Sequence, residues 1–364
     1  MNQEFKPDIA ELLQRASNDL RIGIPVAVLE GGSGILALSV ETASDQRLLS
    51  AAQCDGAVLA LTARRAATLK SRIYDGDMAR IRIPANAAPQ LLRSLADPST
   101  DLWNPLKGPL ESVRNGPAGA CRRAIELARS ARLLPAVVAV PVQNAEAVAE
   151  ANRLVCLGQE LWEEMPSSPR HLERLISAQL PLPVSEDARI HVFRTEGATE
   201  EHCAIEIGVP SRDRPVLARM HSACFTGDVL ESLKCDCGNQ LRSALEIISG
   251  EGNGILLYLN QEGRGIGLTN KIRAYSLQDQ GFDTVEANHR LGFEDDERDF
   301  RAGADMLRQL GFSGVRLMTN NPAKLMMLES QGINVVERVP LLAGRTCHNE
   351  AYLATKASKS GHIL

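Results

Sequence analysis

Short apolar runs alternate with segments of helical periodicity along most of this sequence. In its second half the runs PVLARMHS, GILLYLN and VRLMTNN are separated by the helical patterns QLRSALEIIS and FRAGADMLRQLG. Apolar runs of this length are typical of strands, and apolar residues three or four positions apart are typical of helices. Ahead of them, IHVFRT and CAIEIGV alternate polar and apolar residues, which predicts antiparallel strands. We therefore expect a domain of α/β to α+β class with a mixed sheet.

The first part of the chain predicts a separate α/β domain. GIPVAVLE, GAVLALT and LLPAVVAVPV are typical of buried strands, while Pro, Asn and Gly between residues 85 and 117 predict loops. A polar stretch with four spaced prolines follows, and we place the domain boundary within it, near Leu182. Since 364 residues can bury two cores, we expect one domain at residues 1–180 and another at 181–364.

Composition limits the classes of partner. The hydrophobic fraction of 44% and the charged fraction of 23% are ordinary for a globular protein. A formal net charge of -5 gives no overall attraction to nucleic acid or an anionic membrane, so we expect a small-molecule partner held by local cations. No apolar run approaches the ~20 residues that span a bilayer, and we expect a cytoplasmic protein. In that reducing compartment, closely spaced cysteines favour metal binding or catalysis over disulfides.

Three cysteines lie close together in HSACFTGDVLESLKCDCG, at Cys224, Cys235 and Cys237. Thiolates are preferred zinc ligands, and a structural zinc normally has four protein ligands. Three thiols leave one position open for water, whose acidity the metal raises, so they favour a catalytic zinc. The alternative is a structural zinc with a fourth ligand such as His221 or Cys203, and spacing alone does not exclude it.

The spacing also predicts local structure, because Cys235 and Cys237 are two residues apart and cannot share a helical face. We expect both in a turn, with Gly238 bending the backbone before a helix that begins near Asn239. The remaining cysteines have no close thiol neighbour and are interpreted as small buried hydrophobic residues. They are Cys54, Cys121, Cys156, Cys203 and Cys347.

Two further motifs suit an anionic ligand. GILLYLNQEGRGIGLTNK predicts a buried strand, a glycine-rich turn that contains Arg264, and a helix start near Thr269. VRLMTNNPAK predicts a strand that ends at a helix N-terminus, where amides and Lys324 can meet an anion. Each has a plainer interpretation, since glycine-rich turns often serve tight packing and Thr319 can cap a helix without any ligand. The acidic run GFEDDERDF is, by itself, typical of a solvated turn.

Together these motifs resemble GTP cyclohydrolase II, the first committed enzyme of riboflavin synthesis. The segments that carry the resemblance occur in order and without large gaps, and they are HSACFTGDVLESLKCDCG, QEGRGIGL, NKIRAYSLQDQGFDTVEANHRLGFEDDERDF and TNNPAKL. The resemblance implies a homodimer that uses zinc and magnesium to hydrolyse GTP to 2,5-diamino-6-(5-phospho-ribosylamino)pyrimidin-4(3H)-one, formate and pyrophosphate. It also implies that Cys224, Cys235 and Cys237 hold the zinc, whose bound water attacks C8 of the guanine ring.

The same resemblance implies roles for three more residues. Asp296 would accept a proton, Arg298 would be the nucleophile at the α-phosphate, and Tyr275 would act near the zinc-bound water. A guanidinium stays protonated in proteins, so stabilising phosphoryl charge is the physically firmer role for Arg298. A tyrosine on a helix is otherwise more often a core residue with a wet hydroxyl. The residues implied to contact GTP are Arg219, His221, Ser222, Gln240, Glu262, Gly263, Arg264, Thr284, Thr319 and Lys324.

Two positions depart from the usual pattern of that family. Ala223 stands where a glutamate commonly precedes the first zinc cysteine, and Asn260 stands where an arginine often precedes Gln-Glu-Gly-Arg. The first change removes a carboxylate beside the zinc ligands, and the second removes a phosphate contact. Neither position is an implied zinc ligand or catalytic residue.

The first domain resembles 3,4-dihydroxy-2-butanone 4-phosphate synthase, which is often fused ahead of GTP cyclohydrolase II, in its pattern of strands and helices. Where that family has an acidic metal-binding run, this chain has EGGSGILAL with Glu30 as the remaining acid. Where it has Gly-His-Thr-Glu, this chain has Gly116, Pro117, Ala118 and Gly119. Without those acids and that histidine there is neither a hard-metal site nor an acid/base pair. We expect residues 1–180 to be catalytically silent and kept for packing, dimerisation or regulation.

Two other hypotheses remain open from the sequence. One is a paralogous cyclohydrolase that acts on another purine nucleotide or stops after releasing pyrophosphate. The other is a GTP-binding regulatory protein whose zinc is structural, with four protein ligands and no turnover.

Overall fold

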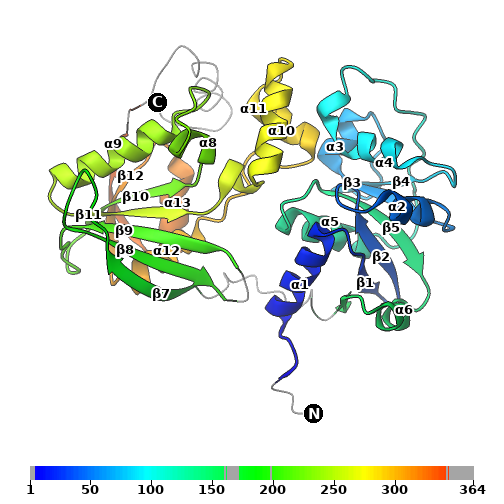
Figure 1. Cartoon of the computed structure of the whole chain (residues 1–364), viewed down its shortest axis with the longest axis horizontal. Coiled ribbons are helices and arrows are strands. Elements are labelled where there is room, and N and C mark those ends of the chain that lie inside the picture. Colours follow the sequence, from blue (N-terminus) through cyan, green and yellow to red (C-terminus); the bar gives the residue numbers. More distant parts are fainter. Residues whose placement is uncertain (1–4, 160, 162–171, 197–198, 342, 344–364) are drawn as a thin grey trace. The chain divides into compact units, whose positions relative to one another are not determined.

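The computed structural model describes residues 5–159, 161, 172–196, 199–341 and 343. The chain forms two compact units, each with its own sheet (Figure 1). The first unit contains Met1–Met165 together with Thr269–Asp296, and the second contains Pro166–Leu268 together with Glu297–Leu364. This division differs from the two contiguous domains expected from the sequence, because a strand upstream of Leu182 pairs into the second sheet and an internal segment folds with the first unit.

The first unit contains a six-stranded sheet in the order β4-β3-β5-β2-β1-β6. Its strands are β1 (Val26–Glu30), β2 (Ser33–Ser39), β3 (Val58–Thr62), β4 (Met78–Arg82), β5 (Ala136–Val142) and β6 (Cys156–Leu157). Neighbouring strands are antiparallel except for β1 and β6, which are parallel. Gly31 and Gly32 connect β1 to β2 with φ of +56° and +82°, the left-handed conformation that a tight two-residue hairpin requires.

The helices of the first unit come from both of its segments. They are α1 (Ile9–Arg21), α2 (Asp45–Ala52), α3 (Ala63–Thr68), α4 (Pro89–Ala96), α5 (Gly119–Ser130), α6 (Ala145–Asn152), α10 (Leu268–Asp279, from Thr269 onward), α11 (Thr284–Leu291) and the 3-10 turn η2 (Pro98–Thr100). The prediction of loops between residues 85 and 117 is confirmed only in part, because α4 and η2 lie within this range while residues 101–117 are irregular. Both helices begin with proline, which suits a first helical turn.

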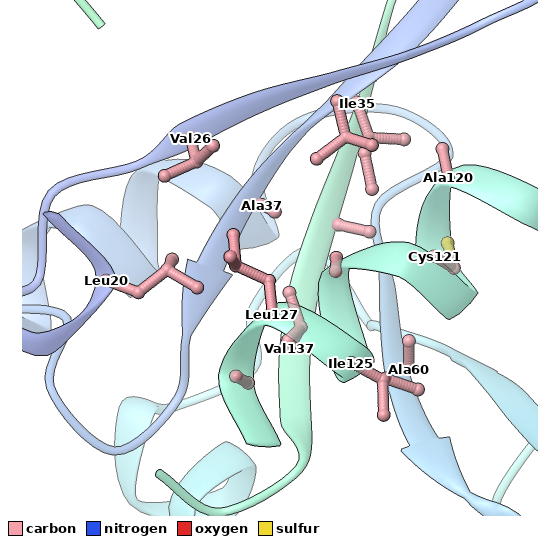
Figure 2. Close-up of a cluster of buried hydrophobic side chains, with 14 of the residues drawn as sticks. Leu20, Val26, Ile35, Ala37, Ala60, Ala120, Cys121, Ile125, Leu127 and Val137 are labelled. Atoms are coloured by element: carbon pink, nitrogen blue, oxygen red, sulfur yellow. The ribbon is translucent and has the colours of Figure 1, made fainter. Parts of the chain in front are cut away.

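The hydrophobic core of the first unit lies between its sheet and helices α1 and α5. Val26 and Val28 belong to this core, whereas Ala27 between them packs with α6 on the other face, as the alternation of a strand requires. Leu20 of α1 and Leu127 of α5 reach the same strands (Figure 2). The described residues contain no helix that is long and apolar enough to cross a membrane.

The second unit contains a seven-stranded sheet in the order β13-β12-β10-β11-β9-β8-β7. Its strands are β7 (Leu172–Gln179), β8 (Ala188–Thr195), β9 (Glu201–Ile207), β10 (Val216–Ser222), β11 (Gly254–Leu259), β12 (Gly314–Met318) and β13 (Asn334–Val339). β7, β8, β9 and β11 pair antiparallel, while β10 pairs parallel with β11 and β12, and β12 pairs parallel with β13. The expected mixed sheet and the α/β to α+β class are confirmed.

Helices cover both faces of the second sheet. They are α9 (Cys237–Gly250) on one face and α12 (Arg301–Gln309) with α13 (Pro322–Ser330) on the other, and the short turns α8 (Phe225–Asp228) and η3 (Glu262–Gly265) follow strands. On β10, Ala218 packs with the α12 face and Leu217 packs with the α9 face. The alternation of the strand therefore places Arg219 and His221 on the α9 face.

The parallel pairing of β10, β11 and β12 brings their carboxyl ends to one edge of the sheet. Cys224 follows β10, Glu262 follows β11 and Thr319 follows β12. Ligands of α/β sheets bind outside the carboxyl ends of parallel strands. The motifs singled out in the sequence therefore meet where such a fold places a binding site.

Replacing Leu127 with alanine tests the packing of α5. This side chain is 3% exposed in the core, so we expect the free energy of unfolding of the first unit to fall by about 2–5 kcal/mol. Hydrogen exchange in denaturant, followed on peptides from β1 and β2, measures this unit by itself. Leu106→Ala is the control, because Leu106 is 89% exposed; equal losses in the two variants would contradict the core described here.

Candidate active site

Cys224, Cys235 and Cys237 come together between the end of β10 and the start of α9. Their sulfur atoms all lie within 4.8 Å of one another, and those of Cys224 and Cys235 are 3.7 Å apart. Two sulfurs in a tetrahedral zinc shell, each about 2.3 Å from the metal, lie about 3.8 Å apart, so this spacing fits zinc. The hydrogen bond with Cys224 raises the pKa of Cys235. A cation among the thiols would oppose that shift by favouring the thiolates.

Two glycines leave the space that the thiols occupy. A Cβ added at Gly227 would lie 2.8 Å from the sulfur of Cys235 and 3.1 Å from that of Cys224. A Cβ added at Gly238 would lie 2.0 Å from the carbonyl oxygen of Gly227. Even one methyl group at either position would push into the cluster or its supporting backbone.

The helix predicted to begin near Asn239 is present and starts two residues earlier, at Cys237. Cys235 precedes the helix and Cys237 is its first residue, so the pair straddles the helix start. Gly238 lies within the helix and has no left-handed backbone. Gly238 therefore allows the Gly227 backbone to approach closely, and it does not bend the chain as expected.

Neither proposed fourth ligand joins the thiols. Among the residues that the structure describes, the three cysteines are the only group of three or more His, Cys, Asp or Glu with the spacing of a metal site. His221 directs its Nε2 atom at Asp228, 3.0 Å from Oδ1. Cys203 is a half-buried residue of β9 outside the group.

Asp228 organises the backbone and side chains next to Cys224. Its carboxylate accepts hydrogen bonds from the Cys224 amide at 3.0 Å, from the Tyr258 hydroxyl at 2.9 Å and from the His221 ring. The rings of His221 and Tyr258 stack with centroids 5.6 Å apart. Burial lowers the pKa of His221, although Asp228 opposes the shift, and burial raises the pKa of Tyr258. A neutral His221 that donates from Nε2 leaves Nδ1 as an acceptor, and this buried atom has no hydrogen-bond partner in the described part of the chain.

Glu262 connects the glycine-rich turn to the thiol cluster. Its carboxylate accepts the amide of Phe225 at 2.6 Å and that of Gly263 at 2.9 Å. Gly263 and Arg264 both have left-handed backbone, with φ of +64° and +61°. For a residue with a side chain this conformation costs roughly 1–2 kcal/mol, so the surrounding turn must hold Arg264 there. A Cβ at Gly265 would lie 2.7 Å from the Glu297 carbonyl oxygen, so this part of the turn does serve tight packing.

Arg219 is a buried cation on the α9 face, held at two points. It donates to the carbonyl of Met318 at 3.0 Å and to the side chain of Gln240 at 2.6 Å, and Gln240 donates in turn to Asp236 at 2.6 Å. Burial lowers the pKa of Arg219 to about 10, which leaves it charged near neutral pH. Its Nε atom is buried without a hydrogen-bond partner in the described residues. An unsatisfied donor of this kind is available to an anion.

Two more cations lie around the Phe300 ring. The guanidinium carbon of Arg298 is 4.8 Å from the ring centroid, and the Lys324 ammonium is 4.9 Å from it. Arg298 also donates to the Ser222 hydroxyl at 3.4 Å, while Lys324 donates to the Met220 carbonyl at 2.8 Å. The second unit thus brings together Arg219, Arg298 and Lys324 around β10.

Thr319 is buried directly after β12, where the chain turns into α13. Its hydroxyl accepts the Asn321 amide at 3.0 Å, and Asn321 caps α13 by accepting the amide of Ala323 at 3.0 Å. Thr319 supports the helix start, and Asn321 is its cap. In the plainer interpretation of the sequence, Thr319 itself was the helix cap, whereas the structure gives this role to Asn321.

Three of the residues expected in the site belong to the first unit. Tyr275 is a half-buried residue of α10, 5.7 Å from the Lys271 ammonium to its ring centroid. Thr284 is the first residue of α11 and accepts a hydrogen bond from Gln278 at 3.2 Å. Asp296 is exposed in the irregular segment before α12.

Sequence reasoning missed Asp228 and Tyr258. Asp228 lies four residues after Cys224 in FTGD, so one helical turn places it back at the cysteine amide, and this spacing could have indicated it. Tyr258 is opposite His221 in the register of β10 and β11. Two strands so distant in sequence carry no local signal of their register.

The two departures from the family pattern have different surroundings. Ala223 brings no carboxylate to the thiols. The backbone amides of the next two residues, Cys224 and Phe225, are instead bound by Asp228 and Glu262. Asn260 is exposed, and its amide donates to the ring of His202 at 3.0 Å.

The other cysteines match their predicted burial only in part. Cys121 is buried as expected, whereas the prediction for Cys54 is wrong because it is exposed just beyond the end of α2. Cys156 and Cys203 are half-buried, and Cys347 lies outside the described residues.

Glu30 in the first unit is engaged by a helix. Its carboxylate accepts the amides of Gly119 at 3.0 Å and Ala120 at 2.7 Å, which are the first residues of α5. The N-cap position of α5 is Ala118, which has no side chain that could cap. Glu30 therefore supplies from β1 the negative charge that a helix N-terminus favours.

The chain is similar to several known proteins. The family model of GTP cyclohydrolase II matches residues 173–340. A protein named GTP cyclohydrolase-2 from Azospirillum brasilense is 45% identical over an alignment of 360 residues that covers 97% of this chain and 94% of that protein. Another of the same name from Salmonella typhimurium is 56% identical over 193 residues, 53% of this chain and 98% of that protein. A crystal structure of a two-domain 3,4-dihydroxy-2-butanone 4-phosphate synthase from A. baumannii aligns with 92% of this chain at 16% identity and a TM-score of 0.31.

A thiol cluster and buried cations at the carboxyl ends of parallel strands define a candidate metalloenzyme of mixed α/β fold. The 45% identity to the Azospirillum brasilense protein extends over nearly the whole of both chains, which identifies the family within this class. The chain belongs to the GTP cyclohydrolase II family, as the motifs of its second half had suggested.

Replacing Gly227 with alanine tests the metal site without removing a ligand. The added methyl group would lie 2.8–3.1 Å from atoms of the three cysteines, so we expect zinc affinity to fall on the order of tenfold or more. Competition with a chromophoric chelator measures it. Gly250→Ala at the end of α9 is the matched control, because no atom lies within 4 Å of a Cβ there; unchanged affinity in Gly227→Ala would show that the thiols do not form the site.

Proposed function

We propose that this protein hydrolyses GTP to 2,5-diamino-6-(5-phospho-ribosylamino)pyrimidin-4(3H)-one, formate and pyrophosphate, the first step of riboflavin synthesis. The observation that carries the proposal is a group of three thiols, without a fourth protein ligand among the described residues, in a chain of this family. Cys224, Cys235 and Cys237 would hold one Zn²⁺. When bound, zinc with an open position supplies a water that is acidic enough to react near neutral pH.

The residues around the thiols would fix the site before substrate arrives. Asp228 orients His221 through Nε2, so that the unpartnered Nδ1 faces away from the carboxylate as an acceptor. Glu262 and Asp228 hold consecutive amides at Cys224 and Phe225. Since both acceptors are carboxylates of the protein itself, holding this backbone in place needs no group from the substrate.

Two buried cations and the half-buried Arg298 would bind the triphosphate. Arg219 has an unpartnered Nε–H, and Lys324 and Arg298 carry charge near the same strand. GTP is a polyanion, and cations taken out of water bind phosphate more strongly than exposed ones. For Arg298 we propose stabilisation of charge at the α-phosphate, because the nucleophilic role implied by resemblance requires a deprotonated guanidinium. Water would then attack the α-phosphate, Asp296 would accept its proton, and pyrophosphate would leave.

The remaining parts of the proposal come from the family's pattern. Mg²⁺ would accompany the phosphates of GTP, the chain would act as a homodimer, and Tyr275 would act near the reacting water. Further contacts to GTP are proposed for Ser222, Gln240, Gly263, Arg264, Thr284 and Thr319. Gln240 is already oriented by Arg219 and Asp236, so its amide can be presented to the purine in one direction.

The first unit is proposed to be catalytically silent. Glu30 is the one acid that remains where the synthase family has its acidic metal-binding run. It binds the N-terminus of α5 through both carboxylate oxygens. Within the described residues of this unit there is no cluster of acids and histidines with metal-site spacing. A synthase reaction on a ketopentose phosphate would need such groups.

Incubation with GTP, Zn²⁺ and Mg²⁺, with formate and pyrophosphate followed separately, tests the proposed function. We expect the wild-type protein to release both products. Cys235→Ser removes a zinc ligand, so we expect formate release to be lost while pyrophosphate release, which depends on the cations, continues at a measurable rate.

Cys203→Ser is the matched control, because this half-buried thiol lies outside the cluster and should leave both rates unchanged. Full formate release by Cys235→Ser would contradict a catalytic zinc. Wild-type release of pyrophosphate alone would indicate a paralogous reaction, and GTP binding without either product would indicate a regulatory protein.

Ribulose 5-phosphate tests the silence of the first unit. With the full chain and Mg²⁺ we expect no butanone phosphate, because Glu30 is engaged and Gly116 to Gly119 offer no acid or base. Mass spectrometry of the reaction mixture measures the product. Its formation would overturn the proposed silence.

A further inference from the structure

Arg298 lies in a segment that no helix or strand holds. The residues from Phe293 to Phe300 are irregular, and α12 begins only at Arg301. A group that stabilises charge in a transition state has to be held within a fraction of an ångström of its productive position. Contacts from other parts of the second unit must therefore fix Arg298.

Two hydrogen bonds hold the backbone on either side of Arg298. On one side, the Glu297 amide donates to the Arg264 carbonyl at 2.9 Å. On the other side, Nε2 of Gln261 donates to the Asp299 carbonyl at 2.6 Å. All of these residues belong to the second unit. The part of the chain that follows β11 thus fixes the backbone of Arg298 from both directions.

The side chain of Arg298 depends on that backbone for its position. It donates to the Ser222 hydroxyl at 3.4 Å, which is long for a hydrogen bond, and its guanidinium carbon is 4.8 Å from the centroid of the Phe300 ring. Ser222 is the last residue of β10, so the sheet holds it in place. A shift of Arg298 by roughly 0.5 Å away from this strand would break the hydrogen bond.

Gln261 is buried, and its side-chain amide can be oriented in only one way. The side chain is 8% exposed. A carbonyl oxygen can only accept a hydrogen bond, so the atom that faces Asp299 must be the nitrogen. Oε1 is then buried without a hydrogen-bond partner among the residues that the structure describes. Such an atom is destabilising, and an apolar side chain would avoid that cost. What glutamine adds at this position is the bond to the Asp299 carbonyl.

We propose that Gln261 is a positioning residue for Arg298, which it holds through the Asp299 carbonyl. The inference rests on the proposed function, since it concerns the charge that Arg298 would stabilise at the α-phosphate. Gln261 is not among the residues to which the family resemblance gives a role. Arg219 and Lys324 donate to carbonyls of β12 and β10 and would still bind the phosphates. Loss of the Gln261 bond should therefore slow the reaction of bound GTP and leave its binding nearly unchanged.

Gln261→Met tests this role, because methionine has a similar length and no hydrogen-bond donor. We expect kcat for pyrophosphate release to fall on the order of tenfold, while KM for GTP changes by less than about twofold. Gln261→Glu puts a carboxylate against the Asp299 carbonyl, so we expect kcat to fall further. Initial rates over a range of GTP concentrations measure both constants. A residue needed only for folding would not lower kcat without changing KM.

Gln309→Met is the matched control. Gln309 also donates through Nε2 to a backbone carbonyl, that of Leu172, and it is the last residue of α12, outside the candidate site. This variant should have wild-type kcat and KM. Equal kcat values in Gln261→Met and Gln309→Met would overturn the inference, and so would a loss in Gln261→Met that falls on KM alone.

Hydrogen exchange separates the inference from the proposed function, because it needs no turnover. In the full chain, Gln261→Met should speed exchange in peptides that contain Glu297 and Arg298, while Gln309→Met should leave them unchanged. Wild-type protein that releases no pyrophosphate would contradict the proposed function, and exchange would still show whether Gln261 holds the segment. Unchanged exchange of these peptides in Gln261→Met would overturn the inference, whatever the activity.

Discussion

The parallel pairing of β10 with β11 and β12 is the constraint on which the candidate site depends. Parallel strands end at the same edge, so the cysteine, glycine-rich and Thr-Asn motifs meet there despite their separation along the chain. The register of β10 and β11 also sets His221 opposite Tyr258, and Asp228 binds both of them. A shift of one residue in this register would send His221 to the other face and break the group.

The site carries features that work against folding. Arg219 is a buried cation with an unpartnered Nε–H, His221 has an unpartnered Nδ1, and Arg264 has left-handed backbone. Each lowers the free energy of unfolding, since unpaired buried polar groups and strained dihedrals are destabilising. Such features concentrate at functional sites, where a bound ligand can supply the missing partners.

Local patterns predicted much of the second unit. The strand and helix spacing predicted the mixed sheet, and the crowding of Cys224, Cys235 and Cys237 predicted their convergence, because a short span of chain cannot separate them far. The helix predicted to begin near Asn239 starts two residues earlier, since helix ends depend on caps and packing as well as on periodicity. Asp228 and Tyr258 were missed because their roles arise from hydrogen bonds and register. The attachment of residues 269–296 to the first unit also depends on contacts distant in sequence, such as Arg273 with Glu41, which no local pattern encodes.

The use of Glu30 as a helix cap has an evolutionary consequence. Its carboxylate binds two amides at the start of α5, where Ala118 offers no cap of its own. A variant that gained histidine or acids near residues 116–119 would still find this carboxylate engaged, and releasing it would leave α5 uncapped at a cost of about 0.5–2 kcal/mol. A metal site built around Glu30 would therefore require a new cap and new ligands together. The stability of one helix thus limits what single mutations can add to this unit.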